Sequence, residues 1–365
     1  MRPELIVASK EFRDYLSSHR FLLLFGMLAL LSVIGAVSGI SEYNSALAEY
    51  NSNLQQASSA AEGFRLRVEM PSILSIFSSY GTYIATFGML LAVSMGFDMI
   101  SREKEEGTLK LLLTHPVFRD QVINGKIIGA VAMMAVVMLS TFAAIVAIML
   151  FFGIVPAGDD LIRIGAFLAA TLLFLLAYLA IAVMCSTVAR NSSMAMLIAI
   201  AIVLVGMLVP NLSGTIADVA LGEEPEMLLP TATSGQSAAG GLMTVIRSQF
   251  ALNESGIQGG RQGTPMQINP EYTDYWGKRN QITGIINVIS PSSDFTSISR
   301  AITGRMASPE SGGGLMARFF VRLSDEPVSI WQSLSSVWTN FLALFVIIAV
   351  GFGISYARFV RVDVR

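Results

Sequence analysis

The sequence predicts an all-α polytopic membrane protein with six transmembrane helices and a long extracytoplasmic segment between the fifth and the sixth. One observation is the composition, because 53% of the 365 residues are hydrophobic and only 14% are charged. A soluble domain with so few charges would struggle to cover its surface. The second is that the charges lie between uncharged stretches of about 20 residues or more, the length that crosses a bilayer. The net charge of −2 does not indicate a nucleic-acid partner.

Residues 1–20 form a leader in which positive charges alternate with apolar residues. Leu5, Phe12 and Leu16 recur at helical spacing opposite charged positions, which is typical of an amphipathic helix lying on a membrane surface. An ordinary solvated leader is the alternative. Phe21–Ser41 follows without a charge and predicts the first span, which we expect to be retained because it exceeds the roughly 7–15 apolar residues of a secretory signal.

The remaining spans follow from uncharged stretches. Residues 42–69 are polar and expected to be helical in part. The second to sixth spans are predicted within Tyr80–Phe97, Ile127–Gly153, Ile164–Thr187, Met194–Val209 and Val337–Tyr356. Pro210 is expected to end the fifth, because proline cannot donate a helical hydrogen bond. The first five spans thus fall in residues 21–210, and residues 331–365 hold the sixth and a tail.

The distribution of positive charge predicts the orientation. Thirteen lysines and arginines lie on the side of the two termini and the 99–126 loop, whereas the short loops of the other side carry only Arg65, Arg67 and Arg163. By the positive-inside rule both termini are cytoplasmic, in a cell membrane. Residues 211–330 are then extracytoplasmic. Their Gly, Ser, Thr and Pro content favours loops around a few short helices, and Ile282–Ile302 is expected in part to lie against the membrane or to cap the spans.

The loop between the second and third spans carries the densest charge. Gly107 is expected to break the helix that descends from the second span, and Thr108 to cap a short new helix that includes Leu109. Pro116 is expected to interrupt the helical structure again, before a helix that includes Lys126 and leads into the third span. The pattern predicts a helix–break–helix elbow over residues 99–126 with charges at its tip. A solvated loop that has no partner is the alternative.

One stretch of this elbow resembles a known family. Ile100–Leu109, ISREKEEGTL, together with the following Leu112-Leu113, Pro116, Arg119 and Gly125-Lys126, is similar to the segment after the second span of ABC-2 type ABC transporter permeases. The six-span layout and the Ile289–Ile302 stretch also resemble that family. The resemblance implies an export permease that pairs with a second permease copy or homologue and binds a separate ABC ATPase subunit. The residues it assigns to ATPase docking are Arg102, Glu103, Lys104, Glu105, Glu106, Gly107, Thr108 and Leu109.

Other chemistries lack the residues they need. The sequence contains no GxxxxGK[ST] phosphate-binding motif, so we expect ATP to be hydrolysed by the partner subunit and no cofactor to be bound by this chain. His19 and His115 have no neighbouring Cys or His, so no metal site is expected. Cys185 lies in an apolar run, typical of a buried hydrophobe. The nineteen methionines indicate packing more than a metal relay.

Three other classes of membrane protein are the alternatives to this family. No ionisable residue lies deep inside a predicted span, the nearest being Asp98 at the end of the second, which argues against an ion-coupled carrier. An intramembrane enzyme would need paired acids or a Ser/His pair at membrane depth. A structural or signalling membrane protein that displays residues 211–330 is the main alternative to a transporter.

Overall fold

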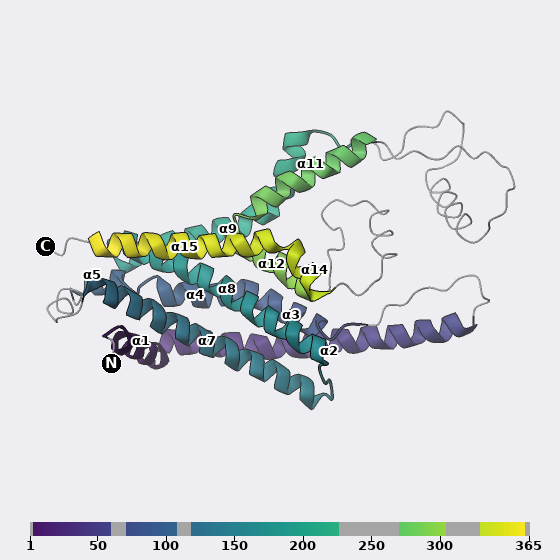
Figure 1. The fold of residues 1–365 in the computed structure, drawn as a ribbon, viewed down its shortest axis with the longest axis horizontal. Coiled ribbons are helices and arrows are strands. Elements are labelled where there is room, and N and C mark those ends of the chain that lie inside the picture. Colours follow the sequence, from purple (N-terminus) through teal and green to yellow (C-terminus); the bar gives the residue numbers. More distant parts are fainter. Residues whose placement is uncertain (1–2, 60–70, 108–117, 226–269, 304–328, 362–365) are drawn as a thin grey trace.

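The computed structural model describes residues 3–59, 71–107, 118–225, 270–303 and 329–361. Regular structure in these ranges is helical, without a strand, and six helices are long and apolar enough to cross a membrane. The chain is therefore a multi-pass membrane protein, and the predicted fold class is confirmed. Figure 1 shows the spans gathered in one bundle, with α1 and the last turns of α15 at the same end. We call this end the α1 end.

The helices have the following bounds in chain order. They are α1 (Pro3–Ser17), α2 (His19–Ser59), α3 (Ser75–Tyr83), a π-helical turn η1 (Ile84–Gly88), α4 (Met89–Gly96), α5 (Ser101–Glu105), α7 (Arg119–Phe151), α8 (Gly158–Val188), α9 (Ser192–Leu221), α11 (Pro270–Asn287), α12 (Pro291–Ile302), α14 (Ile330–Ser336) and α15 (Trp338–Arg361). The segment predicted to be partly helical, 42–69, continues α2 as far as Ser59. Thr108, Leu109 and residues 226–269 and 304–328 of the outer segment lie outside the described residues.

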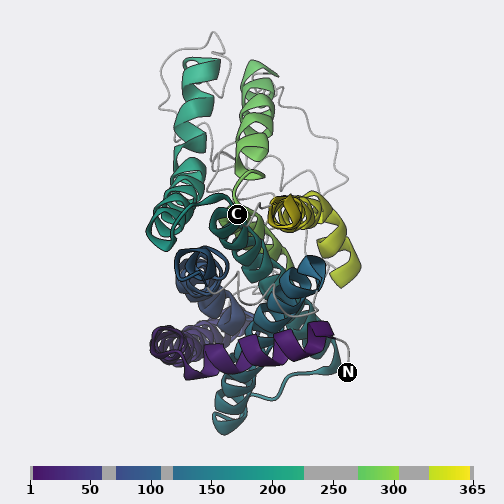
Figure 2. The same cartoon turned by 90° about the vertical axis from the view of Figure 1, so that its left-hand side faces the viewer.

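Helix α1 lies crosswise over the α1 end of the bundle, as Figure 2 shows. It packs on α7 through Ala8 and Glu11, which are buried, whereas the apolar Leu5 and Leu16 are exposed. The helix therefore has an apolar face directed away from the protein, as expected of a helix at a membrane surface.

Helix α8 lies at the centre of the bundle and packs against α15, α4, α12 and α9. Around its outer half the aromatic rings of Phe77, Phe142, Phe167 and Phe295 form a continuous buried cluster, with centroids of neighbouring rings about 6 Å apart. Tyr80 joins this cluster edge-on to Phe142 and shares a hydrogen bond of 3.1 Å with Thr141. The cluster joins the second, third and fourth spans to α12.

Helix α9 does not end at Pro210, so that prediction is wrong. The helix continues to Leu221 with Pro210 inside it. Proline has no N–H, so the carbonyl of Gly206, one turn earlier, loses its helical donor. The hydroxyl of Ser290 donates to this carbonyl at 2.6 Å. A residue from the turn between α11 and α12 thus replaces the missing hydrogen bond and allows the helix to continue.

Helices α11 and α12 form a re-entrant hairpin. Helix α11 packs along the outer part of α9, where Arg279 pairs with Asp218. In Figure 1, α11 and this outer part of α9 project from the bundle. The turn at Ser290 reaches Gly206, about 21 Å along α9 from its first residue at 1.5 Å per residue, which is near the middle of a bilayer. Helix α12 then returns outward against α8. The part of Ile282–Ile302 that the sequence expected to lie against the membrane or to cap the spans therefore packs against α8 and α9.

Candidate coupling site

Helix α5 holds four of the five charged residues that the resemblance assigns to ATPase docking. Four residues separate it from α4, and its first turn is attached to α8 by Ser186. The hydroxyl of Ser186 accepts hydrogen bonds from the backbone N–H groups of Ile100 and Ser101, both at 3.0 Å. Because the first N–H groups of a helix have no partner in the helix, this hydroxyl both caps α5 and fixes it to the fourth span.

A buried lysine joins α5 to two other helices. The ammonium group of Lys126 on α7 lies 2.6 Å from Glu11 Oε1 of α1 and 2.7 Å from Glu103 Oε1 of α5, and its side chain is 2% exposed. A buried cation needs such partners because its desolvation costs several kcal/mol. The ion triad therefore connects the leader, the elbow and the third span at one point.

Tyr15 reinforces this junction. Its hydroxyl donates a hydrogen bond of 2.9 Å to the carbonyl of Met95 on α4. Burial, and next the negative charge of Glu11, raise the pKa of Tyr15 well above its usual value, so the hydroxyl keeps its proton and remains a donor. Helix α1 is thus tied to the second span as well as to the third.

Lys104 and Glu105, which follow Glu103 on α5, bind the backbone at the end of α8 and the start of α9. Lys104 Nζ donates to the carbonyl of Thr187 at 2.6 Å and to that of Ala189 at 3.5 Å, at the end of α8. Glu105 Oε2 accepts from the backbone N–H of Ser192 at 3.1 Å, at the start of α9. A cation at a helix C-terminus and an anion at an N-terminus both interact favourably with the helix dipole. Helix α5 therefore bridges the α8–α9 turn.

Among the described residues of the elbow, Arg102 and Glu106 carry its exposed ion pair. The pair has a distance of 2.8 Å, with side chains 63% and 50% exposed. Gly107 follows with φ of 71°, a left-handed conformation that favours glycine. The sequence predicted charges at the tip of the elbow without dividing them; of these residues, Glu103 and Lys104 face the protein. Thr108 and Leu109 lie outside the described residues.

Two cavities flank α5. The larger, of about 670 Å³, lies between α1, α4, α5 and α7, and its wall carries charges of both signs, including Lys10, Asp14, Arg102 and Glu106. The smaller, of about 460 Å³, lies between α5, the α8–α9 turn and α15, and none of its described lining residues is a carboxylate. The two cavities share no lining residue.

Sequence reasoning missed one buried acid in the hairpin. Asp294 on α12 is fully buried, and Asn340 on α15 donates to its Oδ1 at 2.8 Å. Its Oδ2 has no hydrogen-bond partner within the described part of the chain. The available signal was a lone acid in the 291–302 stretch, outside any predicted span. The re-entrant hairpin is what brings it against the bundle.

Comparison with known proteins gives the family. The model of a family described as "ABC-2 family transporter protein" matches residues 5–364. The chain belongs to the ABC-2 transporter family. This ABC-2 permease is 30% identical over 192 residues, 52% of its length, to the probable ABC transporter permease protein NosY of Pseudomonas aeruginosa, and covers 61% of that protein. It is 32% identical over 143 residues, 39% of its length, to the NosY of Stutzerimonas stutzeri, and covers 50% of it.

The chain thus spans between half and about three fifths of the curated relatives it matches. Both relatives are named as probable ABC transporter permeases, and permeases of the ABC-2 family normally work with an ATPase subunit. Six apolar helices agree with that membrane role. Within this ABC-2 permease, α5 is the charged element at which α1, α7, α8 and the start of α9 are joined.

Proposed function

We propose that this permease exports its cargo under the control of a separate ATPase subunit that docks on the elbow formed by α5 and the residues after it. One observation carries the proposal. The inner side of α5 is fixed to α1, α7, α8 and α9, while Arg102, Glu106 and Gly107 are exposed. A force applied to the exposed tip would therefore move several spans together.

The ATPase subunit supplies the chemistry in this proposal. ATP binding closes the pair of ATPase subunits and hydrolysis reopens it, so the elbow moves between two positions and a path between paired permeases alternates its access. The second permease is a copy of this chain or a homologue. The positive charges gathered at the α1 end support a cytoplasmic location for that end and for both termini.

The docking surface is tested by reversing its exposed charges. The tagged chain is purified from its native membranes in four forms. These are the native chain, Glu106→Arg, the double swap Arg102→Glu/Glu106→Arg, and the matched control Arg13→Glu, which changes an exposed residue of α1. We expect a Walker-containing ATPase to co-purify with the native chain and the control, and to fall at least tenfold with Glu106→Arg. The double swap keeps an ion pair between positions 102 and 106 but exchanges the two charges. A partner that recognises these charges should therefore fail to co-purify with the double swap as well.

Two results would contradict the proposal. If the swap restores ATPase retention, Arg102 and Glu106 stabilise only the local helix. If no ATPase accompanies even the native chain, a structural or signalling role for the outer segment becomes the better interpretation.

Export is tested by comparing cells that lack the chain with cells whose partner ATPase carries a substitution of its Walker lysine. Mass spectrometry of cell extracts should show the same compound or lipid accumulating in both strains. Depletion of that compound in both strains would instead mean import.

A further inference from the structure

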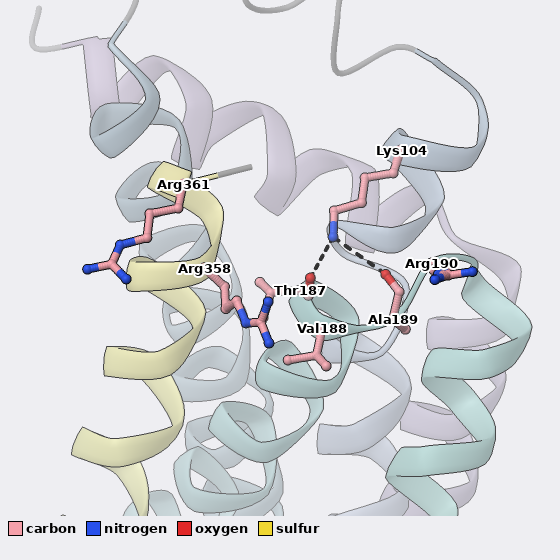
Figure 3. A pocket seen from close by; sticks show the side chains of 7 residues that line it. All are labelled: Lys104, Thr187, Val188, Ala189, Arg190, Arg358 and Arg361. Carbon is pink, nitrogen blue, oxygen red and sulfur yellow. Dashed lines mark hydrogen bonds between the residues drawn. The ribbon is translucent and has the colours of Figure 1, made fainter. Parts of the chain in front are cut away.

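The smaller cavity beside α5 is lined by four cations from three parts of the chain. Lys104 comes from α5, Arg190 from the α8–α9 turn, and Arg358 and Arg361 from the last turns of α15. Thr187, Val188 and Ala189 complete the lining, and Figure 3 shows the arrangement. We call this cavity the basic pocket.

Within the described part of the chain, the positive charge of the basic pocket is only partly balanced. Lys104 is held by the Thr187 and Ala189 carbonyls. None of the three arginines forms an ion pair with a carboxylate in the described ranges. The C-terminal ends of α8 and α15 each contribute about half a negative charge, which leaves a clear positive excess. In Figure 3 Arg358 is directed toward the end of α8, while Arg190 and Arg361 lie on either side.

The pocket lies at the α1 end of α8, α9 and α15, and these helices also carry exposed apolar side chains. Val188, in its wall, is 48% exposed. Beyond it Met194 and Leu197 on the first turns of α9, and Ile354 on α15, are also exposed. A ligand with both an anionic group and hydrocarbon chains would match both surfaces, whereas an acidic protein segment would match the cations alone.

We propose that the basic pocket binds the phosphate of an anionic membrane lipid, whose acyl chains lie along α9 and α15. Basic pockets between transmembrane helices are suited to anionic head groups, and arginine binds phosphate oxygens with paired hydrogen bonds. The site goes beyond the proposed docking role, because it shares no residue with the exposed Arg102–Glu106 pair. A lipid bound there would fix α15 to the α8–α9 turn.

The test is native mass spectrometry of the full chain in detergent, titrated with phosphatidylglycerol and with phosphatidylcholine. The native chain should bind phosphatidylglycerol at least tenfold more tightly. Arg190→Gln/Arg358→Gln should weaken that binding by about fivefold for each arginine, which corresponds to about 1 kcal/mol each. Lys10→Gln/Arg13→Gln, which removes two exposed cations from α1 outside the pocket, should change it less than twofold.

Further arms separate the lipid from other anions. Arg190→Lys/Arg358→Lys keeps the charge and should retain more of the binding than the glutamine pair, and all variants should keep the native melting temperature. The proposal is overturned if the glutamine pair binds phosphatidylglycerol normally. It is overturned also if inorganic phosphate at equal concentration displaces the lipid, since the ligand would then be a soluble phosphate. Unchanged lipid binding with reduced ATPase co-purification would assign the arginines to the protein partner.

Discussion

Lys126 is the residue on which the junction at the α1 end depends most. It holds Glu11 and Glu103 together, and all three side chains are largely buried. Lys126→Met keeps the length of the side chain but leaves two carboxylates without their cation. Removing one partner of a buried ion pair costs about 3–5 kcal/mol, so we expect the purified variant to melt at a clearly lower temperature. Lys10→Met, at an exposed pair with Asp14, should melt like the native chain.

A triple variant distinguishes the ion triad from simple packing. Glu11→Gln/Glu103→Gln/Lys126→Met removes the two buried negative charges together with the cation, so it should recover part of the stability lost by Lys126→Met alone. A triple variant less stable than Lys126→Met would show that the carboxylates contribute independently of the lysine.

Ser290 should matter only because Pro210 is present. Ser290→Ala removes the donor to the Gly206 carbonyl and leaves a partly buried acceptor unsatisfied, at a cost of up to about 1–3 kcal/mol. Pro210→Ala supplies the missing helical N–H. In the Pro210→Ala background, Ser290→Ala should therefore cost less than half as much by thermal unfolding. Equal costs in both backgrounds would mean that Ser290 acts elsewhere, for example only by packing in the hairpin turn.

Lys126 and Pro210 show which contacts of single residues could not be predicted from the sequence. The sequence places Lys126 at the start of the third span, but its partners lie in α1 and α5, far away along the chain. Pro210 reads as a helix end because its compensating donor is 80 residues later. Local spacing cannot reveal a charge pair or a hydrogen bond that exists only after the helices have packed.

At the scale of elements, the contact of α1 with α7 depends on close approach. At Gly129 an added Cβ would lie 2.8 Å from the carbonyl oxygen of Ala8, which is backbone and cannot give way. Gly129→Val should therefore displace α1, and protease cleavage or amide hydrogen exchange within α1 should increase at least tenfold. Gly165→Val on α8 is the control, because nothing lies within 4 Å of its added Cβ. Unchanged exchange in α1 with Gly129→Val would contradict this packing.

Hydropathy predicted the spans well because the bilayer imposes one length and one polarity on each of them. Hydropathy did not predict helices whose length and position are determined by packing within the bundle. The π-helical turn at Ile84–Gly88 lies inside the second span and packs against α2 and α12, and the re-entrant α12 packs against α8. A 12-residue helix is too short to register as a span. Likewise the elbow was visible as charge, but the division between its buried and exposed charges was not.

At the scale of the whole molecule, the joined helices and the outer hairpin lie at opposite ends of the same spans. Helix α8 contacts α5 through Ser186 and contacts α12 through Phe174, whose ring stacks on Phe295 with centroids 4.6 Å apart. A displacement of the elbow therefore has a continuous path of packed side chains to the hairpin. This is a physical route for coupling, and the α5 variants above are the means of measuring whether it is used.

The orientation of the whole molecule gives the last prediction. The α1 end carries the lysines and arginines of α1, α5, α7 and α15, and such charges are retained in the cytoplasm. The native Cys185 is buried, so introduced cysteines report alone. A membrane-impermeant maleimide should label Glu223→Cys, exposed beyond α9, in intact cells, and Arg13→Cys only after permeabilisation. The reverse pattern would place α5 outside the cell, where no ATP-driven subunit could reach it.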